Sequence, residues 1–191
     1  MKKGMKDNIE RKQPSINHVV MHGEVPLFSF IELNINEICN RVCPFCPRSN
    51  PEKYPNQNIH MGVELAENIA DQLAAINFTG IVNISGTGEP LLTKHIVDIV
   101  RQFGDRDIHT EIVTNGDMLV KKNGPKLIKN LYSAGLRQFV VSMYDGPEQI
   151  ESFDTLFASC DIDKGLYSLR DRWYDESEDY GLLYTNRAGN I

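Results

Sequence analysis

The sequence has no long apolar run, no excess of basic residues and few cysteines. Its apolar stretches are short, as in Phe139-Val140-Val141, whereas a transmembrane helix needs about 20 apolar residues. Twenty basic and 26 acidic residues give a net charge of −6, which argues against nucleic-acid binding because that affinity comes largely from Lys and Arg. The basic start of the chain is not followed by an apolar core, so it is not a secretory signal.

The four cysteines are unevenly placed, with Cys39, Cys43 and Cys46 close together and Cys160 far along the chain. A disulfide framework would be more evenly spread, and it belongs in an oxidising compartment. The clustered cysteines indicate a metal site instead, and we expect a cytoplasmic protein. Cys160 falls at the end of an expected helix and is interpreted as a small buried apolar residue.

Apolar periodicity predicts strands that alternate with helices from residue 27 onward. The expected strands are 28–35, 80–85, 108–114 and 137–143, and the expected helices are 65–76, 96–103, 127–134 and 147–159. Strands at this spacing, each followed by a helix, are typical of parallel βα units, so the expected fold class is α/β with a parallel sheet. Doubtful strands lie at 165–169 and 181–185, with an acidic loop between them, and residues 1–26 are expected to be a flexible leader.

The cysteine loop could bind either of two metal groups. Cys39-x3-Cys43-x2-Cys46 can ligate three irons of a cubane cluster and leave the fourth iron open, although four cysteines are the norm. Together with His60, the same thiolates could form a Cys3His zinc site. A structural zinc usually holds together a module too small to bury its own core, whereas this loop follows a strand of an α/β domain. The cluster is favoured, and the zinc site remains the alternative.

Polar motifs also follow the other three strands, at the end of a parallel sheet where ligands bind. Ser85-Gly86-Thr87-Gly88-Glu89-Pro90 follows the second strand: its glycines allow close backbone approach, Glu89 can accept hydrogen bonds from an ammonium group, and Pro90 fixes the turn. Thr114-Asn115-Gly116 follows the third strand, and Ser142 lies near the end of the fourth. Each motif alone is typical of a turn or cap. Their coincidence at one end of the sheet indicates a ligand site.

Together these motifs resemble those of radical S-adenosylmethionine (SAM) enzymes over about residues 28–146. Members carry Cys-x3-Cys-x2-Cys after the first strand, commonly with an aromatic residue before the last cysteine, here Phe45. They carry a Gly-Gly-Glu-Pro-type motif after the second strand, and Gly86-Thr87-Gly88-Glu89-Pro90 is a variant with one inserted residue. Thr-Asn-Gly after the third strand and a serine on the fourth also recur. The resemblance implies a parallel (β/α) partial barrel.

The resemblance further implies two cofactors and the residues that bind them. Cys39, Cys43 and Cys46 would hold a [4Fe-4S] cluster whose open iron chelates the amino and carboxylate groups of SAM. One electron from the reduced cluster would cleave SAM, and the 5′-deoxyadenosyl radical would abstract a substrate hydrogen. A flavodoxin or ferredoxin would be the reductant. The implied SAM-binding residues are Phe45 near the adenine, Gly86, Gly88 and Glu89, with Pro90, around the methionine ammonium, and Asn115 and Ser142 at the ribose or carboxylate.

The C-terminal region carries a weaker resemblance. Leu169-Arg170-Asp171-Arg172-Trp173 and Asn186-Arg187-Ala188-Gly189 are similar to the stretch that leads into a SPASM-type domain. The expected division is a leader at 1–26, a radical SAM core at 27–160 and an incomplete SPASM-like extension at 161–191. A core of this kind has six βα units and only about four are clear here, so the chain is expected to be truncated or unusually reduced.

The substrate is not identified by the sequence, since the SPASM subgroup acts on peptides, sugars and other small molecules. Arg48, Tyr144 and Asp145 are candidates to face it, and solvated loop residues are an equal interpretation of all three. Besides a zinc-binding interaction module, a second alternative is a catalytically silent remnant that binds the cluster but cannot enclose a substrate.

Overall fold

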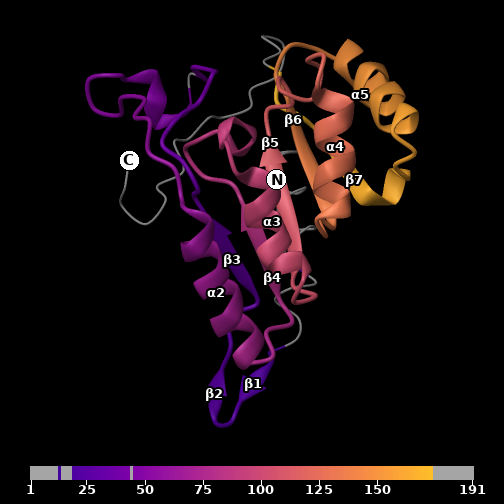
Figure 1. The fold of residues 1–191 in the computed structure, drawn as a ribbon. Helices are drawn as coiled ribbons and strands as arrows, with labels where there is room; N and C mark the ends of the chain where they lie inside the picture. The colour runs from indigo at the N-terminus through magenta and orange to yellow at the C-terminus, as the bar shows by residue number, and fades with distance from the viewer. Residues whose placement is uncertain (1–12, 14–18, 44, 174–191) are drawn as a thin grey trace.

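The computed structural model describes residue 13 and residues 19–43 and 45–173, most of which form an open parallel sheet covered by helices (Figure 1). The five strands, in their order across the sheet, are β3 (Phe30–Leu33), β4 (Ile81–Ile84), β5 (His109–Thr114), β6 (Gln138–Met143) and β7 (Tyr167–Asp171). Each neighbouring pair is parallel. The four expected strands are confirmed, and the doubtful strand near 165–169 is confirmed as β7.

Helices connect the strands, as parallel pairing requires. They are α2 (Val63–Ala75), α3 (Ile96–Gly104), α4 (Gly124–Ser133) and α5 (Glu148–Ser159). Consecutive helices pack against one another, and Figure 1 shows α2, α3 and α4 in front of the sheet. The α/β fold class is confirmed, and the sheet is a partial barrel that does not close, since β3 and β7 are its edges in the described part of the chain.

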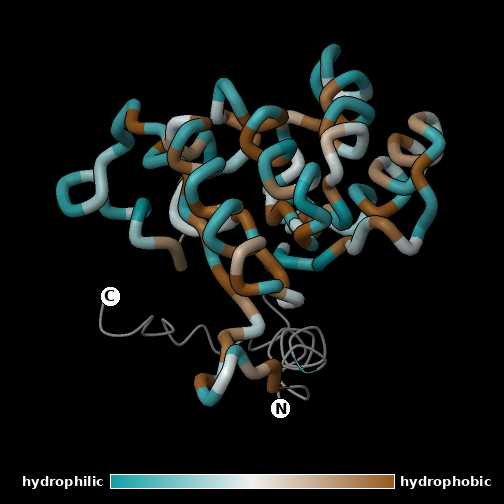
Figure 2. The backbone as a smooth tube through the Cα atoms, turned by 60° about the horizontal axis from the view of Figure 1, so that its bottom comes forward, coloured by the Kyte–Doolittle hydropathy of each residue, from teal (hydrophilic) through white to brown (hydrophobic). Residues whose placement is uncertain are grey.

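The hydrophobic core lies between the sheet and the helices. Helix α3 contributes four residues to this core, and their spacing puts them on one helix face: Ile96, Ile99, Val100 and Phe103. Phe139 of β6 is fully buried in the same core. Figure 2 shows the resulting alternation of hydrophobic and hydrophilic segments along the helices. Burying each such side chain contributes about 1.5–3 kcal/mol, which holds the strand ends in fixed positions.

A short antiparallel hairpin precedes the sheet. Its strands are β1 (Met21–His22) and β2 (Val25–Pro26), and both are exposed. Gly23 in the turn has a φ of 61°, which glycine adopts without steric cost. The sequence does not predict this hairpin within the expected leader, because strands of two residues are too short to give a periodic signal.

The C-terminal part of the chain is only partly described. Strand β7 pairs with β6, so the sheet continues past residue 160, where the core was expected to end. The doubtful strand at 181–185 lies outside the described residues. A search of the described part of the chain finds no helix with both the length and the apolar character needed to cross a membrane.

Candidate cofactor site at the carboxyl ends of the strands

The cysteine loop follows β3, and its three thiols are free and partly buried. The loop turns back on itself, with the Cys46 amide donating to the Cys43 carbonyl at 2.9 Å and the Arg41 amide donating to the Cys39 sulfur at 3.5 Å. Burial raises the pKa of Cys39, and it raises the pKa of Cys43 to about 11. The neighbouring thiols add to both pKa shifts, so the three sulfurs lie within electrostatic range of one another.

These three sulfurs suit an iron–sulfur cluster chemically. Within the described residues, no three His, Cys, Asp or Glu side chains converge closely enough to hold a metal ion as they stand. Thiolates held together without protons repel one another in a half-buried loop, and bound metal cations offset that repulsion. The donor set of three cysteines from one loop therefore fits a cluster that keeps one iron open.

Glu89 is the most enclosed acid of the site, with a residue exposure of 3%. Its carboxylate Oε1 accepts from the Leu91 amide at 3.1 Å and from the Thr114 hydroxyl at 2.7 Å, and its Oε2 accepts from the Asn115 amide at 2.9 Å. A carboxylate has about four acceptor positions, so Oε2 retains capacity for one further donor. Burial raises the pKa of Glu89, while these three hydrogen bonds favour the ionised form.

The two glycines of the β4 loop meet asparagines from the β3 side. A Cβ on Gly86, which has a φ of 127°, would collide with the Asn34 side chain, and a Cβ on Gly88 would collide with Asn36. Asn36 is buried, and its amide donates to the Glu89 carbonyl and to the Thr93 hydroxyl, both at 2.7 Å. In this structure the glycines therefore bring the loop against the chain that leads to the cysteines.

Asn115 also connects the strands at this end of the sheet. Its side-chain nitrogen donates to the side-chain oxygen Oδ1 of Asn40 in the cysteine loop at 2.9 Å, and its side-chain oxygen accepts from the Asp117 amide at 3.0 Å. Ser142 is buried near the end of β6. The ring of Phe45 stacks on Tyr144, with centroids 6.0 Å apart. The remaining implied contact, Pro90, is buried at the start of the short 3-10 helix Pro90–Leu92.

Arg41, which lies between Cys39 and Cys43 and was not predicted as a site residue, joins the cysteine loop to the ends of two other strands. Its guanidinium pairs with Asp117 after β5 and with Asp145 after β6, at 2.5 and 2.6 Å. It also lies 5.4 Å from the centre of the Tyr144 ring. Tyr144 and Asp145 are thus engaged with Arg41 in this structure. An arginine between the clustered cysteines, with acids after two neighbouring strands, is the signal that could have identified it.

Arg48 is an internal residue, whereas the sequence left open whether it faces a substrate or is a solvated loop residue. It is 4% exposed, and four of the five N–H groups of its side chain donate to protein acceptors. A guanidinium that is occupied in this way has little capacity left for a ligand. The interpretation as a solvated loop residue is wrong, because burial of a charged side chain requires partners from other segments, and one sequence does not reveal them.

Among the residues that the structure describes, neither His60, the fourth ligand of the alternative zinc site, nor Cys160 joins the three cysteines in a group that could hold a metal ion. The His60 ring binds Asn58 through Nε2 at 2.9 Å, and the backbone of His60 bridges to Asn36. Cys160 is 3% exposed and follows the last residue of α5, with its sulfur against the Pro125 carbonyl at 3.9 Å. The interpretation of Cys160 as a buried core residue is confirmed.

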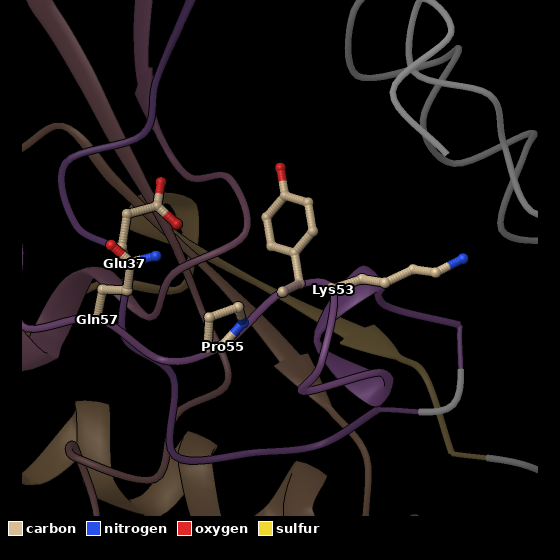
Figure 3. Close-up of a pocket in the computed structure, with 5 residues that line it drawn as sticks. Glu37, Lys53, Pro55 and Gln57 are labelled. Atoms are coloured by element: carbon tan, nitrogen blue, oxygen red, sulfur yellow. The ribbon is translucent and has the colours of Figure 1, made fainter.

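One shallow pocket of about 290 Å³ borders the chain that follows the cysteines. It is lined by Glu37, Lys53, Tyr54, Pro55 and Gln57. Figure 3 shows Glu37 and Gln57 on one side and the Lys53 side chain extending away from them. Glu37 pairs with Arg48 at 2.8 Å, so this pocket lies beside the Arg48 contacts.

Comparison with known proteins gives a consistent set of relatives. The family model of the radical SAM superfamily matches residues 33–156. An S-adenosyl-L-methionine-dependent 2-deoxy-scyllo-inosamine dehydrogenase from Niallia circulans is 29% identical over 167 residues, which is 85% of this chain and 60% of that protein. A GTP 3′,8-cyclase from Limosilactobacillus fermentum is 32% identical over 124 residues, 61% of this chain and 34% of the cyclase.

Solved structures agree with these relatives. The crystal structure of BtrN in complex with AdoMet and 2-DOIA matches with a TM-score of 0.62 at 27% identity, covering 76% of this chain and 57% of that chain. The chain therefore spans about 60% or less of the length of the relatives that it matches.

Proposed function

The chain belongs to the radical SAM superfamily, and from this membership we propose that it cleaves SAM reductively and directs the resulting radical to a substrate hydrogen atom. The convergence of three segments carries this proposal. The cysteine loop, Glu89 and Asn115 come from the ends of three different strands, and hydrogen bonds join them into one site. When bound, the reduced [4Fe-4S] cluster supplies the single electron for the cleavage.

The cysteine loop would hold the cluster through Cys39, Cys43 and Cys46. The loop is attached to the segment after β5 by two hydrogen bonds, because the Asn40 side chain accepts from Asn115 and donates to Asp117. Burial disfavours the thiolate forms of Cys39 and Cys43 and raises their pKa values. Cluster binding therefore requires that these thiols release their protons.

Glu89 and its surroundings would bind the methionine end of SAM. The free acceptor position on Oε2 suits an ammonium group, and burial strengthens a charge-assisted hydrogen bond there. Gly86, Gly88 and Pro90 would shape the backbone around it, and Asn115 and Ser142 would contact the ribose or carboxylate. Phe45, whose ring is already held against Tyr144, would lie near the adenine.

The proposed substrate class is supported by a relative that matches 85% of this chain. That relative is a SAM-dependent dehydrogenase of 2-deoxy-scyllo-inosamine, a small hydroxylated amine. We infer that this chain acts on a small hydroxylated molecule of the same class by dehydrogenation. Another curated relative is a PqqA peptide cyclase from Bradyrhizobium diazoefficiens, 27% identical over 65% of this chain, which keeps a peptide as the second candidate.

The test is anaerobic reconstitution with iron and sulfide, followed by SAM and dithionite, which replaces a flavodoxin or ferredoxin. We expect a brown protein that forms 5′-deoxyadenosine, and faster formation when 2-deoxy-scyllo-inosamine is added. Glu89→Gln is expected to keep the iron content and to raise the SAM concentration for half-maximal cleavage about tenfold or more, since it loses a charge-assisted bond.

Each of the other outcomes would favour a different function for this chain. Stoichiometric zinc without colour would favour the zinc-binding interaction module. An intact cluster without 5′-deoxyadenosine would favour the silent remnant. Faster cleavage with a peptide but not with the small amine would assign the peptide class.

A further inference from the structure

Arg48 makes contacts that join the two halves of the proposed cofactor site. Its Nε donates to the Thr87 carbonyl at 2.6 Å, in the middle of the glycine loop after β4. Its Nη1 donates to the Asn56 side-chain oxygen at 3.1 Å and to the Pro55 carbonyl at 3.0 Å. Its Nη2 forms an ion pair with Glu37 at 2.8 Å. One planar guanidinium thus bonds to three separate segments of the chain.

Asn56 carries this connection to the first cysteine. Its side-chain oxygen accepts from the Cys39 amide at 3.0 Å, and its side-chain nitrogen donates to the Cys39 carbonyl at 3.0 Å. Both hydrogen-bonding groups of the Cys39 backbone are therefore held by one side chain. Because the same oxygen also accepts from Arg48, the path from Thr87 to Cys39 runs through two side chains only.

The chemistry of arginine explains why this residue suits the position. Its five N–H groups lie in one rigid fork, so it can fix acceptors in several directions at once, whereas the lysine ammonium is a single point. The buried charge is offset by the Glu37 carboxylate and three oxygen acceptors. The Tyr54 ring lies 5.9 Å from the guanidinium and covers it further.

We propose that Arg48 is a positioning residue that sets the glycine loop at Thr87 against the cysteine loop at Cys39. With cluster and SAM bound, it would fix the distance between the cluster and the group that binds the methionine ammonium. This role in cofactor geometry rests on the proposed function, whereas the contact between the two loops does not depend on that function.

The test follows backbone hydrogen exchange in the cluster-free chain. Arg48→Gln is expected to speed exchange about tenfold or more in the peptides that contain Cys39 and Thr87, because bonds to a charged group are lost. Exchange in β5 is expected to stay unchanged. Arg48→Lys should not restore slow exchange, because the lysine ammonium lacks the fork of N–H groups. The matched control is Arg101→Gln, which replaces an exposed arginine on α3.

Asn56→Ala separates a relay from a general loss of stability. It removes the link to Cys39 and leaves the bond from Arg48 to Thr87, so we expect faster exchange at Cys39 and no change at Thr87. This variant also decides the proposal if Arg48→Gln does not fold. Uniformly faster exchange in all segments, full rescue by Arg48→Lys, or equal effects of Asn56→Ala on both loops would overturn it.

A second readout concerns the loaded protein. With reconstituted cluster, Arg48→Gln is expected to weaken about tenfold the SAM-dependent change in the electron paramagnetic resonance spectrum, measured as the SAM concentration at half effect. If the wild-type chain shows no such change while the exchange pattern holds, the proposed function fails and the loop coupling stands. If the exchange pattern is absent while the wild type cleaves SAM, the inference about Arg48 fails alone.

Discussion

Among single residues, the four cysteines allow the sharpest separation of roles. Cys39, Cys43 and Cys46 are partly exposed in one loop, whereas Cys160 is buried in the core. Cys39→Ala, Cys43→Ala and Cys46→Ala are each expected to abolish the cluster, measured as iron content and absorption near 400 nm. Cys160→Ala should bind iron normally and lower the free energy of unfolding by about 1–2 kcal/mol, since it leaves a small cavity.

The same cysteine variants can contradict the proposal that only three cysteines bind the cluster. If Cys160→Ala lost its iron while remaining folded by circular dichroism, the cluster would have four protein ligands. The argument that one iron stays open for SAM would then fail.

Asp145 provides a residue-level prediction for pH. Its hydrogen bonds with Arg41 hold the pKa of this carboxyl below its usual range. The contribution of the pair to stability is therefore present above the usual Asp pKa, near 4, and is lost as the pH falls through the lower pKa of the folded state. The urea midpoints of the wild type and Asp145→Asn should differ at pH 7, and this difference should be smaller at pH 3.

The expected difference is small, because more than half of the Asp145 side chain is exposed and solvent screens the pair. It should also shrink at about 1 M salt, where the screening length is about 3 Å. An equal difference at both pH values and at high salt would show that the Asp145→Asn substitution acts through something other than the ion pair.

Between whole elements, the contact of the glycine loop with the end of β3 is the tightest constraint on the site. A Cβ on Gly88 would meet Asn36, which is itself held by two hydrogen bonds. Gly88→Ala is expected to cost about 1–3 kcal/mol of unfolding free energy, as overpacking does, and to weaken SAM binding. Gly165→Ala, where an added Cβ meets nothing within 4 Å, is the control in chemical denaturation. Equal stability of the two variants would contradict this packing role.

The element order could be predicted because apolar periodicity depends on residues near in sequence. Strands β3 to β6 and all four helices were predicted in this way, and the cysteine, glycine and asparagine motifs identified the family that the comparisons confirm. The contacts of Arg41 and Arg48 could not be predicted, because their acceptors lie up to 104 residues away. Glu89 was predicted as a ligand-facing acid, whereas its three internal hydrogen bonds became visible only in the fold.

For the whole molecule, the position of each strand in the sheet predicts its resistance to opening. Strands β4, β5 and β6 each have neighbours on both sides, whereas β3 and β7 have one in the described part of the chain, and the β1–β2 hairpin is exposed. Segments with few buried contacts open at low free-energy cost, and central strands open only on global unfolding, typically at about 5–15 kcal/mol.

Native-state hydrogen exchange of the whole chain, resolved by peptide, should therefore order the elements. The hairpin is expected to exchange first, β3 and β7 next, and β5 last, with a β5 opening free energy equal to that of global unfolding in urea. Because the sheet is parallel and its core lies under the helices, loss of α3 packing should speed hydrogen exchange in β4 and β5 together. Exchange of β7 as slow as that of β5 would contradict this order.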